Sequence, residues 1–233
     1  MGLPGTLLPA QPPVPPQGPQ SEWQKWRLGL AGASGAAVLL VLVLRGAMGF
    51  VGGGSYEFLA TQGDEPVTWD HCHAIRFQIN PKGAPEGWQE TVKQAVADVE
   101  KASGFVFMDL GTTTKTRLIG QRYDGNAWEP VLIMWSDRYQ TDLLDGSVIG
   151  RGGGSMIEVN GRLRYVIGQV WVDSTVRDPF ASRMVLEHEL GHVLGLDHSS
   201  SRQDLMYAHY HGQRGLGSGD IDGLKRLHEV PCD

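Results

Sequence analysis

The chain has 233 residues and a formal net charge of −6, from 20 Lys and Arg against 26 Asp and Glu. This acidic balance, and the lack of any basic run longer than two residues, argue against a nucleic acid as partner. Once a non-globular N-terminal segment is set aside, the length leaves room for one domain with a substantial core.

The first part of the chain divides into three segments that precede the domain. Residues 1–27 form a proline-rich tail with too little apolar surface to fold. Residues 28–44 carry no charge, and their length falls between that of a signal peptide and that of a spanning helix. We therefore expect 28–48 to be a transmembrane signal anchor or a cleaved signal peptide, and both would export the domain. Residues 49–68, which begin with a glycine-rich run, are expected to be a linker.

Residues 69–233 are expected to form the domain. Ile75, Phe77 and Ile79 alternate with polar residues, which predicts a strand at 74–80 with one buried face. Apolar residues at helical spacing predict helices at 85–102, after Pro179 and at about 218–229. Apolar runs and alternation predict strands at 105–110, 131–135 and 163–172. A short edge strand is expected at 147–151, followed by a flexible corner from Gly152 to Gly154.

The helix after Pro179 and the turn at its end contain the sequence HELGHVLGLDH, from His188 to His198. His188 and His192 are four residues apart, so on a helix both imidazoles project from one face. Glu189 lies about 100° round the helix, which places it beside a bound ion. Gly195 allows the chain to leave the helix at positive φ and to return His198 as a third ligand. Three neutral nitrogens with one open position describe a catalytic zinc site.

The stretch from His188 to Tyr207, HELGHVLGLDHSSSRQDLMY, resembles the active-site segment of the matrixin branch of the metzincin metallopeptidases. The resemblance implies one catalytic Zn²⁺ and hydrolysis of peptide bonds, in which Glu189 activates a zinc-bound water and then passes its proton to the leaving amine. It also implies that Met206 forms a hydrophobic floor under the histidines. Tyr210 would line the substrate pocket, although Ala208 stands where the family has a proline.

The order of the predicted elements also resembles that of the matrixin catalytic domain. The implied fold is α+β of the metzincin or zincin-like type, with a twisted, mostly parallel five-stranded sheet packed on the active-site helix, an N-terminal helix and a C-terminal helix. An extended protein or peptide substrate is expected to pair with the edge strand of such a sheet.

Cys72 and Cys232 are the two cysteines of the chain. In an exported protein we expect them to form a disulfide that closes nearly the whole domain and contributes about 4 to 5 kcal/mol by the loop-entropy relation. The alternatives are two buried thiols, pairing between chains, and a latency device in which Cys72 reaches the zinc. His71 and His73 flank Cys72 and could bind a second metal, but solvated histidines are commoner at a strand end.

The leading hypothesis is an exported, monomeric zinc endopeptidase. It would be held in the cell membrane through 28–44 with an extracellular catalytic domain, or be secreted if the apolar segment is cleaved. One alternative is a catalytically inactive, membrane-anchored binding module that keeps zinc for its structure. Another is an adhesion or scaffold domain, which needs no metal.

Overall fold

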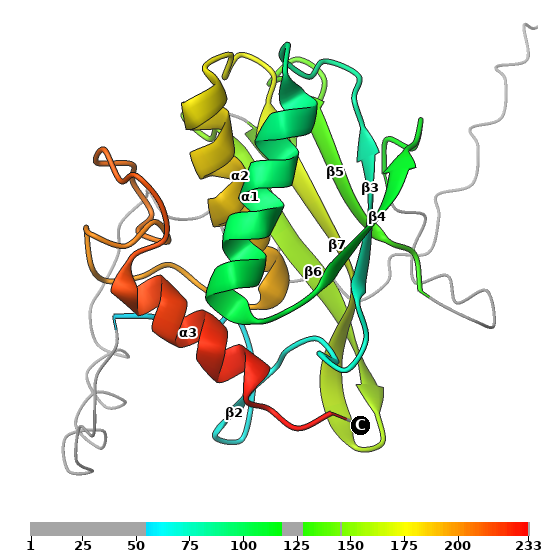
Figure 1. Ribbon diagram of the computed structural model, residues 1–233, viewed down its shortest axis with the longest axis vertical. Helices are drawn as coiled ribbons and strands as arrows, with labels where there is room; N and C mark the ends of the chain where they lie inside the picture. Colours follow the sequence, from blue (N-terminus) through cyan, green and yellow to red (C-terminus); the bar gives the residue numbers. More distant parts are fainter. Residues whose placement is uncertain (1–54, 118–127, 145, 233) are drawn as a thin grey trace, which may run out of the picture. The chain divides into compact units, whose positions relative to one another are not determined.

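The structure, a computed structural model, describes residues 55–117, 128–144 and 146–232 (Figure 1). Its elements are, in chain order, β1 (Thr61–Gln62), β2 (Glu65–Pro66), β3 (Ile75–Asn80), α1 (Trp88–Ser103), β4 (Phe107–Thr112), β5 (Val131–Ser136), η2 (Asp142–Leu144), β6 (Gly150–Val159), β7 (Arg162–Asp173), α2 (Pro179–Leu194) and α3 (Ser218–His228).

The centre of the domain is a five-stranded sheet with the order β4-β3-β5-β7-β6. β3 pairs in parallel with β4 and β5, and β5 pairs in parallel with β7, whereas β6 runs antiparallel to β7 at the edge. All residues of β5 are buried and most are apolar, which is typical of a parallel strand covered on both faces. The predicted α+β fold with a mostly parallel five-stranded sheet is confirmed.

α1 and α2 lie side by side on one face of this sheet, as Figure 1 shows. α1 buries one side through Val92, Ala95, Val96 and Val99. It ends at Gly104, whose φ of 82° is one that residues with a side chain rarely adopt. α2 is buried on nearly all sides, because α1, α3, β6 and β7 all contact it. A helix in this position holds its side chains in fixed orientations.

The edge strand differs from its prediction. The sequence predicts a short strand at 147–151 and a flexible corner at Gly152 to Gly154, whereas the structure has one continuous strand of ten residues, β6. The glycines permit close packing: a Cβ at Gly152 would lie 2.2 Å from the backbone oxygen of Glu189 in α2, and one at Gly150 would lie 2.5 Å from the carboxylate of Glu189. Since these positions lack side chains, the strand can approach the helix closely.

Residues 55–68, predicted as part of the linker, are packed on the domain instead. Val67 is 1% exposed and belongs to the hydrophobic core. Phe58 forms a bridge with Leu196, just after the end of α2. Apolar side chains in this segment gain burial that a glycine-rich linker cannot gain. The linker prediction is therefore wrong over these residues.

The predicted membrane segment at 28–48 and the tail at 1–27 lie outside the described residues. Within the part of the chain that the structure describes, no helix is both long and apolar enough to cross a membrane. The signal anchor and the signal peptide both stay predictions.

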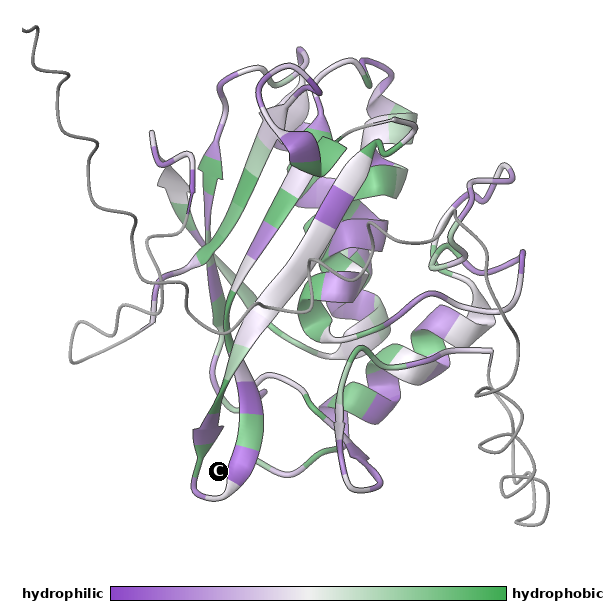
Figure 2. Ribbon diagram, turned by 180° about the vertical axis from the view of Figure 1, so that it is seen from behind, coloured by the Kyte–Doolittle hydropathy of each residue, from purple (hydrophilic) through white to green (hydrophobic). Residues whose placement is uncertain are grey.

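The β6–β7 hairpin extends beyond the other strands, and the segment after α3 returns to lie beside it (Figure 2). Arg162 and Arg164 of β7 both donate hydrogen bonds to the carbonyl oxygen of Pro231. A disulfide joins Cys72, which precedes β3, to Cys232. These contacts fasten the segment after α3 to the sheet.

Candidate active site

α2 begins and ends at residues suited to those places. Asp178 precedes it, and its carboxylate accepts a hydrogen bond from a backbone N–H of the first turn at 2.8 Å. Gly195 ends the helix with a φ of 121°, in the positive range that the sequence predicts. The chain turns there and brings His198 to the side of α2 that carries His188 and His192.

The three histidines present ring nitrogens to one point. The ligand atoms of His188, His192 and His198 all lie within 4.8 Å of one another, and Nε2 of His188 lies 3.1 Å from Nε2 of His192. Nδ1 of His188 donates to the carbonyl oxygen of Leu205 at 2.7 Å, and Nδ1 of His192 donates to that of Leu196 at 2.8 Å. Because a carbonyl oxygen only accepts, both Nδ1 atoms carry the proton and both Nε2 atoms present a lone pair.

This arrangement suits a zinc ion. Two lone pairs that face each other at 3.1 Å repel unless a cation lies between them. Two nitrogens bound to one tetrahedral zinc at about 2.05 Å lie about 3.3 Å apart, so the observed spacing is close to the required one. The backbone carbonyls behind the two rings fix their orientation, as is usual for histidines that bind metals. The residues present therefore fit a zinc held by three imidazoles.

Burial lowers the pKa of all three histidines. It is the largest cause in each case, and it lowers the pKa of His188 to about 4 and the pKa of His192 well below its usual value. The pKa of His198 is also lowered, mainly by burial, although the nearby charge of Asp197 opposes this. The rings are therefore neutral at pH 7, and the neutral imidazole is the form that binds a metal.

Glu189 comes directly after His188 on α2, and its carboxylate lies against β6. It is 6% exposed. Burial raises the pKa of Glu189 to about 8, while a hydrogen bond from the N–H of Gly152 and the charge of Arg151 act to lower it. A divalent cation held by the histidines would favour the ionised form, because a nearby positive charge lowers the pKa of a carboxyl group. The edge strand thus holds this carboxylate through a backbone N–H.

Met206, the predicted floor of the site, packs directly on α2. It is 1% exposed, and a Cβ at Gly191 would lie 2.5 Å from its Sδ. Position 191 lies between His188 and His192 in sequence, so the thioether contacts the turn of the helix that presents both rings. Gly191 was not among the predicted site residues, although it stands inside the HELGH motif and its lack of a side chain admits Met206.

Two buried aspartates outside the predicted site hold the segment around Met206. Asp220 in α3 accepts hydrogen bonds from the N–H of Leu205 at 2.6 Å and from that of Met206 at 3.2 Å. Asp204 accepts a hydrogen bond from the hydroxyl of Ser199 at 2.7 Å. Burial raises the pKa of Asp220 to about 6; backbone N–H groups oppose this, and the charge of Asp204 adds to it. α3 therefore positions the backbone of Leu205 and Met206.

Tyr210, the predicted pocket residue, lies in the segment after Met206. Its side chain is 56% exposed. The neighbouring His209 acts to lower the pKa of His198, so this segment runs close to the histidine cluster. The role of Tyr210 as a pocket wall stays a prediction.

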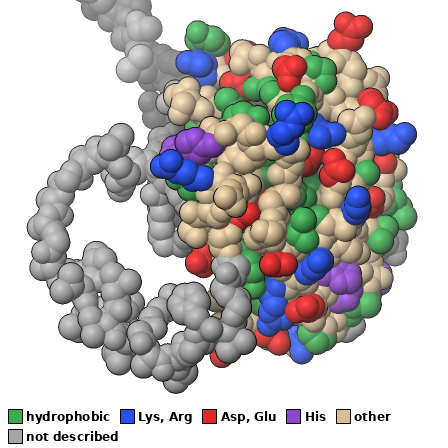
Figure 3. Space-filling view, turned by 60° about the vertical axis from the view of Figure 1, so that its left-hand side comes forward, with side chains coloured by type: hydrophobic (Ala, Val, Ile, Leu, Met, Phe, Trp, Pro, Cys, Tyr) green, Lys and Arg blue, Asp and Glu red, His purple; other side chains and the backbone are tan. Residues whose placement is uncertain are grey.

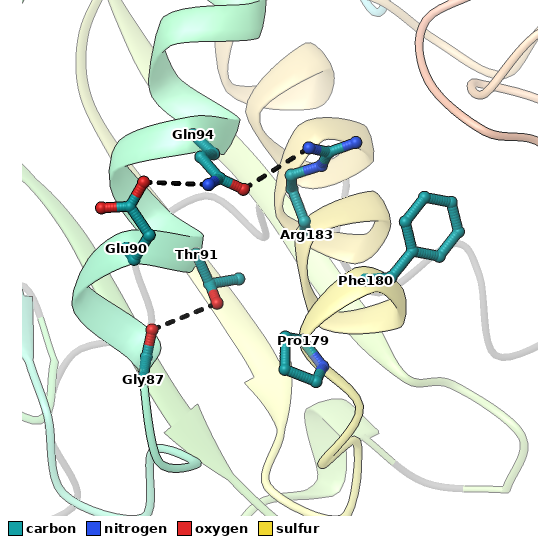
Figure 4. A pocket seen from close by; sticks show the side chains of 7 residues that line it. All are labelled: Gly87, Glu90, Thr91, Gln94, Pro179, Phe180 and Arg183. Carbon is teal, nitrogen blue, oxygen red and sulfur yellow. Dashed lines mark hydrogen bonds between the residues drawn. The ribbon is translucent and has the colours of Figure 1, made fainter.

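A surface pocket lies between the N-terminal halves of α1 and α2 (Figure 4). Nη1 of Arg183 on α2 lies 3.5 Å from Oε1 of Gln94 on α1. The same guanidinium lies over the ring of Phe180, 5.6 Å from its centroid. The residues that line this pocket include none of the three histidines and not Glu189. It is therefore not part of the candidate site.

The surface charge gives no guide to a partner on the face shown in Figure 3. Acidic and basic side chains are interspersed there, and neither sign forms a large patch. Recognition through a field of one sign is therefore not expected on this face.

The fold and the histidine cluster together define a metzincin metallopeptidase: a mostly parallel five-stranded sheet on a helix that carries HELGH, with a third histidine beyond a glycine turn. A family model described as Matrixin matches residues 69–229. The chain belongs to the matrixin family.

Relatives with known names match parts of the chain. Metalloendoproteinase 1 of Glycine max is 32% identical over 94 residues, which are 36% of this chain and 30% of that protein. The hatching enzyme of Paracentrotus lividus is 35% identical over 85 residues, which are 34% of this chain and 14% of that protein. The matching stretches thus span less than a third of these relatives. The crystal structure of metalloproteinase-II from Bacteroides fragilis is similar with a TM-score of 0.44 and 22% identity, over 71% of this chain and 55% of that one.

Proposed function

We propose that the chain is an exported zinc endopeptidase, with His188, His192 and His198 as zinc ligands and Glu189 as general base. The observation that carries the proposal is the pair of unprotonated Nε2 atoms of His188 and His192, which face each other at 3.1 Å. A buried carboxylate stands one residue after the first of these rings on the same helix. Membership of the matrixin family supports the reaction class, and the name of the Glycine max relative agrees with it.

A bound zinc supplies a Lewis acid that lowers the pKa of a water molecule to about 7 and polarises a carbonyl group. Glu189 contributes the proton transfers. Its carboxylate accepts a proton from the attacking water and delivers it to the nitrogen of the departing amine, which leaves in neutral form. The hydrogen bond from the N–H of Gly152 keeps the carboxylate in place during these transfers.

The substrate in this proposal is an extended protein or peptide. β6 is an edge strand, so one side of its backbone is free of pairing within the sheet and offers N–H and C=O groups to a bound chain. The segment that contains Tyr210 would form the opposite wall. We propose that the enzyme acts as a monomer.

The proposed location is extracellular. The apolar run at 28–44 supports export, either as a membrane anchor or as a cleaved signal peptide. The disulfide between Cys72 and Cys232 agrees with this, since disulfides persist in oxidising compartments.

The alternative is a binding module that keeps zinc without catalysis. One observation favours it: Glu189 is only 6% exposed, and its carboxylate already accepts a hydrogen bond from Gly152. A general base that a water molecule cannot reach would not take part in the reaction.

The test is cleavage of a mixed peptide library by the purified chain, with zinc content measured in the same samples. We expect cleavage that a chelator abolishes and added zinc restores. Glu189→Gln should lower kcat/KM by about 10³-fold and leave zinc binding intact. The matched control is Glu187→Gln on the same helix. Glu187 is also buried, and its carboxylate lies 3.2 Å from Nε of Arg183, so this variant tests whether loss of a buried carboxylate on the same helix is enough to abolish cleavage.

Each proposal has its own contradicting result. Full activity in Glu189→Gln would rule out the proton-transfer role. A wild-type chain that holds one zinc and cleaves nothing in the library would favour the binding module. A wild-type chain that holds no zinc would contradict both.

A further inference from the structure

We propose that Cys72, Cys232 and His71 form a second metal site, which binds zinc when the disulfide between the two cysteines is reduced. The three residues come from distant parts of the chain. His71 and Cys72 precede β3, and Cys232 lies beyond α3, 160 residues after Cys72. One imidazole and two sulfurs of this kind are a ligand set that zinc prefers.

The ligand atoms are already close to their required positions. The ligand atoms of His71, Cys72 and Cys232 all lie within 4.8 Å of one another. Nε2 of His71 lies 3.3 Å from Sγ of Cys232. A nitrogen at about 2.05 Å and a sulfur at about 2.3 Å from one tetrahedral zinc lie about 3.6 Å apart, so this pair needs almost no movement.

The separation of the two sulfurs is what has to change. Two thiolates on one tetrahedral zinc lie about 3.8 Å apart, whereas a covalent S–S bond holds the sulfurs at about 2 Å. Cys232 lies in a segment without regular secondary structure, and Cys72 lies in a turn, so neither sulfur is tied to a helix or a strand. An opening of about 1.8 Å can therefore occur without disrupting the sheet or α3.

Packing against the rings of His228 and Phe105 holds the ring of His71. It stacks on the ring of His228 with the centroids 4.2 Å apart, and it meets the edge of Phe105 at 6.4 Å. Its Nδ1 is buried, and within the described residues it has no hydrogen-bond partner. Packing thus fixes the ring with Nε2 directed at the sulfur of Cys232, whereas the backbone hydrogen bond at Nδ1 that orients His188 and His192 is not made by His71.

Neighbouring histidines do not complete the set in the same way. His73 pairs with Asp70 at 2.7 Å, and its side chain is 82% exposed. His228 does not belong to the cluster of ligand atoms formed by His71, Cys72 and Cys232. Among the described residues no fourth side chain joins His71, Cys72 and Cys232, which leaves the fourth position on the zinc to a water molecule or another small ligand.

The reduction that opens the site can be written in full. A dithiol reductant breaks the S–S bond, transfers two electrons and two protons to Cys72 and Cys232, and becomes a cyclic disulfide. Zinc then displaces one proton from each thiol and binds two thiolates and the neutral imidazole of His71. Cys72 is exposed, so a reductant can reach the bond. The metal then links the segment before β3 to the segment after α3 in place of the covalent bond.

Zinc stoichiometry of the oxidised and the reduced full chain tests this inference. The chain is reduced with a dithiol, freed of reductant under anaerobic conditions and titrated with zinc alone. We expect reduction to add one zinc per chain, both in the wild type and in a His188→Ala, His192→Ala variant that lacks the first site. This increment does not depend on the proposed peptidase activity, so the two can fail separately.

Single variants and cobalt identify the ligands. Replacing zinc by Co²⁺ should give a thiolate-to-cobalt charge-transfer band in the reduced chain and none in the oxidised chain. His71→Ala should weaken the added site at least tenfold, while the matched control His73→Ala should leave it unchanged. The inference is overturned if reduction adds no zinc, if Cys72→Ser keeps the added zinc with unchanged affinity, or if the reduced chain unfolds and zinc does not restore its near-UV circular dichroism.

Discussion

The closest approach between β6 and α2 makes Gly152→Ala the most informative substitution in the proposed active site. A Cβ at this position would lie 2.2 Å from the backbone oxygen of Glu189, whereas ordinary contact begins at 3.4 Å. The strand must therefore retreat from the helix by about 1.2 Å, since a backbone oxygen inside a buried helix cannot rotate away. The N–H of Gly152 moves with the strand and releases the carboxylate of Glu189.

The expected loss is a consequence of this displacement. A misplacement of about 1 Å in a catalytic group costs on the order of 100-fold in rate, so kcat/KM of Gly152→Ala should fall by about 100-fold. Overpacking should also lower the free energy of unfolding by about 1 to 3 kcal/mol. Zinc content should not change, because carbonyls of Leu205 and Leu196 anchor His188 and His192.

The matched control is Gly154→Ala on the same strand. There the added Cβ would meet the backbone oxygen of Ile167 at 2.9 Å and the ring of Tyr165 at 3.0 Å, and it would not contact Glu189. It should destabilise the fold yet keep kcat/KM within about threefold of wild type. Peptide cleavage under conditions in which circular dichroism shows each variant folded compares the two. A folded Gly152→Ala chain with wild-type kcat/KM would refute this role of the strand.

Three further predictions concern stability. Asp220 has a folded pKa of about 6 against 3.8 in the unfolded chain, so its contribution is full below pH 4 and is lost as the pH rises through 6. At 1.36 kcal/mol per pKa unit, the free energy of unfolding of metal-free wild type should fall by about 2 kcal/mol relative to Asp220→Asn between pH 4 and pH 7. Parallel curves would contradict this. Trp69 donates its Nε1–H to the buried carbonyl oxygen of Val193 at 2.7 Å. Trp69→Phe leaves that oxygen unpaired and should lower the free energy of unfolding, measured in urea, by about 1 to 3 kcal/mol. A decrease below about 0.5 kcal/mol would argue against a stabilising role of this hydrogen bond. Removal of zinc should lower the midpoint temperature of thermal unfolding, because a ligand that binds only the folded state stabilises that state. A midpoint that does not depend on zinc concentration would mean that the folded chain does not bind the ion.

Local periodicity was enough to predict most of the fold. The strand at 74–80 and the helix at 85–102 appear as β3 and α1, displaced by no more than three residues at either end. Both have apolar residues at a regular spacing, and both bury that face in the common core. α2 was located by its motif, and Gly195 does leave the helix at positive φ.

The errors share one physical cause, which is packing between segments far apart in the sequence. Three consecutive glycines have the composition of a loop, and nothing near Gly152 in the sequence indicates that Glu189 will lie against it. Likewise, nothing beside Phe58 and Val67 in the sequence indicates which surface covers them, whereas in the structure Phe58 pairs with Leu196 and Val67 belongs to the core. Propensity is a weak guide wherever tertiary contacts decide the conformation.

The same limit applies to the candidate site. The spacing of HELGHVLGLDH identified three histidines that the structure brings together. It could not identify Asp220, which holds the backbone of Met206 from another helix. A carboxylate that binds backbone N–H groups has no spacing rule relative to them, so only the fold shows the pair.

The start of the described domain is joined directly to the loop that carries the third histidine. The N–H of Leu59 donates to the carbonyl of Gly195, the N–H of Asp197 to that of Glu57, and the N–H of Ser200 to that of Ser55, each within 3.0 Å. A mechanical load applied at Ser55 would therefore reach residues 195–200 through three hydrogen bonds in shear, before it reached the sheet. If the chain is tethered through its N-terminal part, tension on the tether would act first on the geometry around His198.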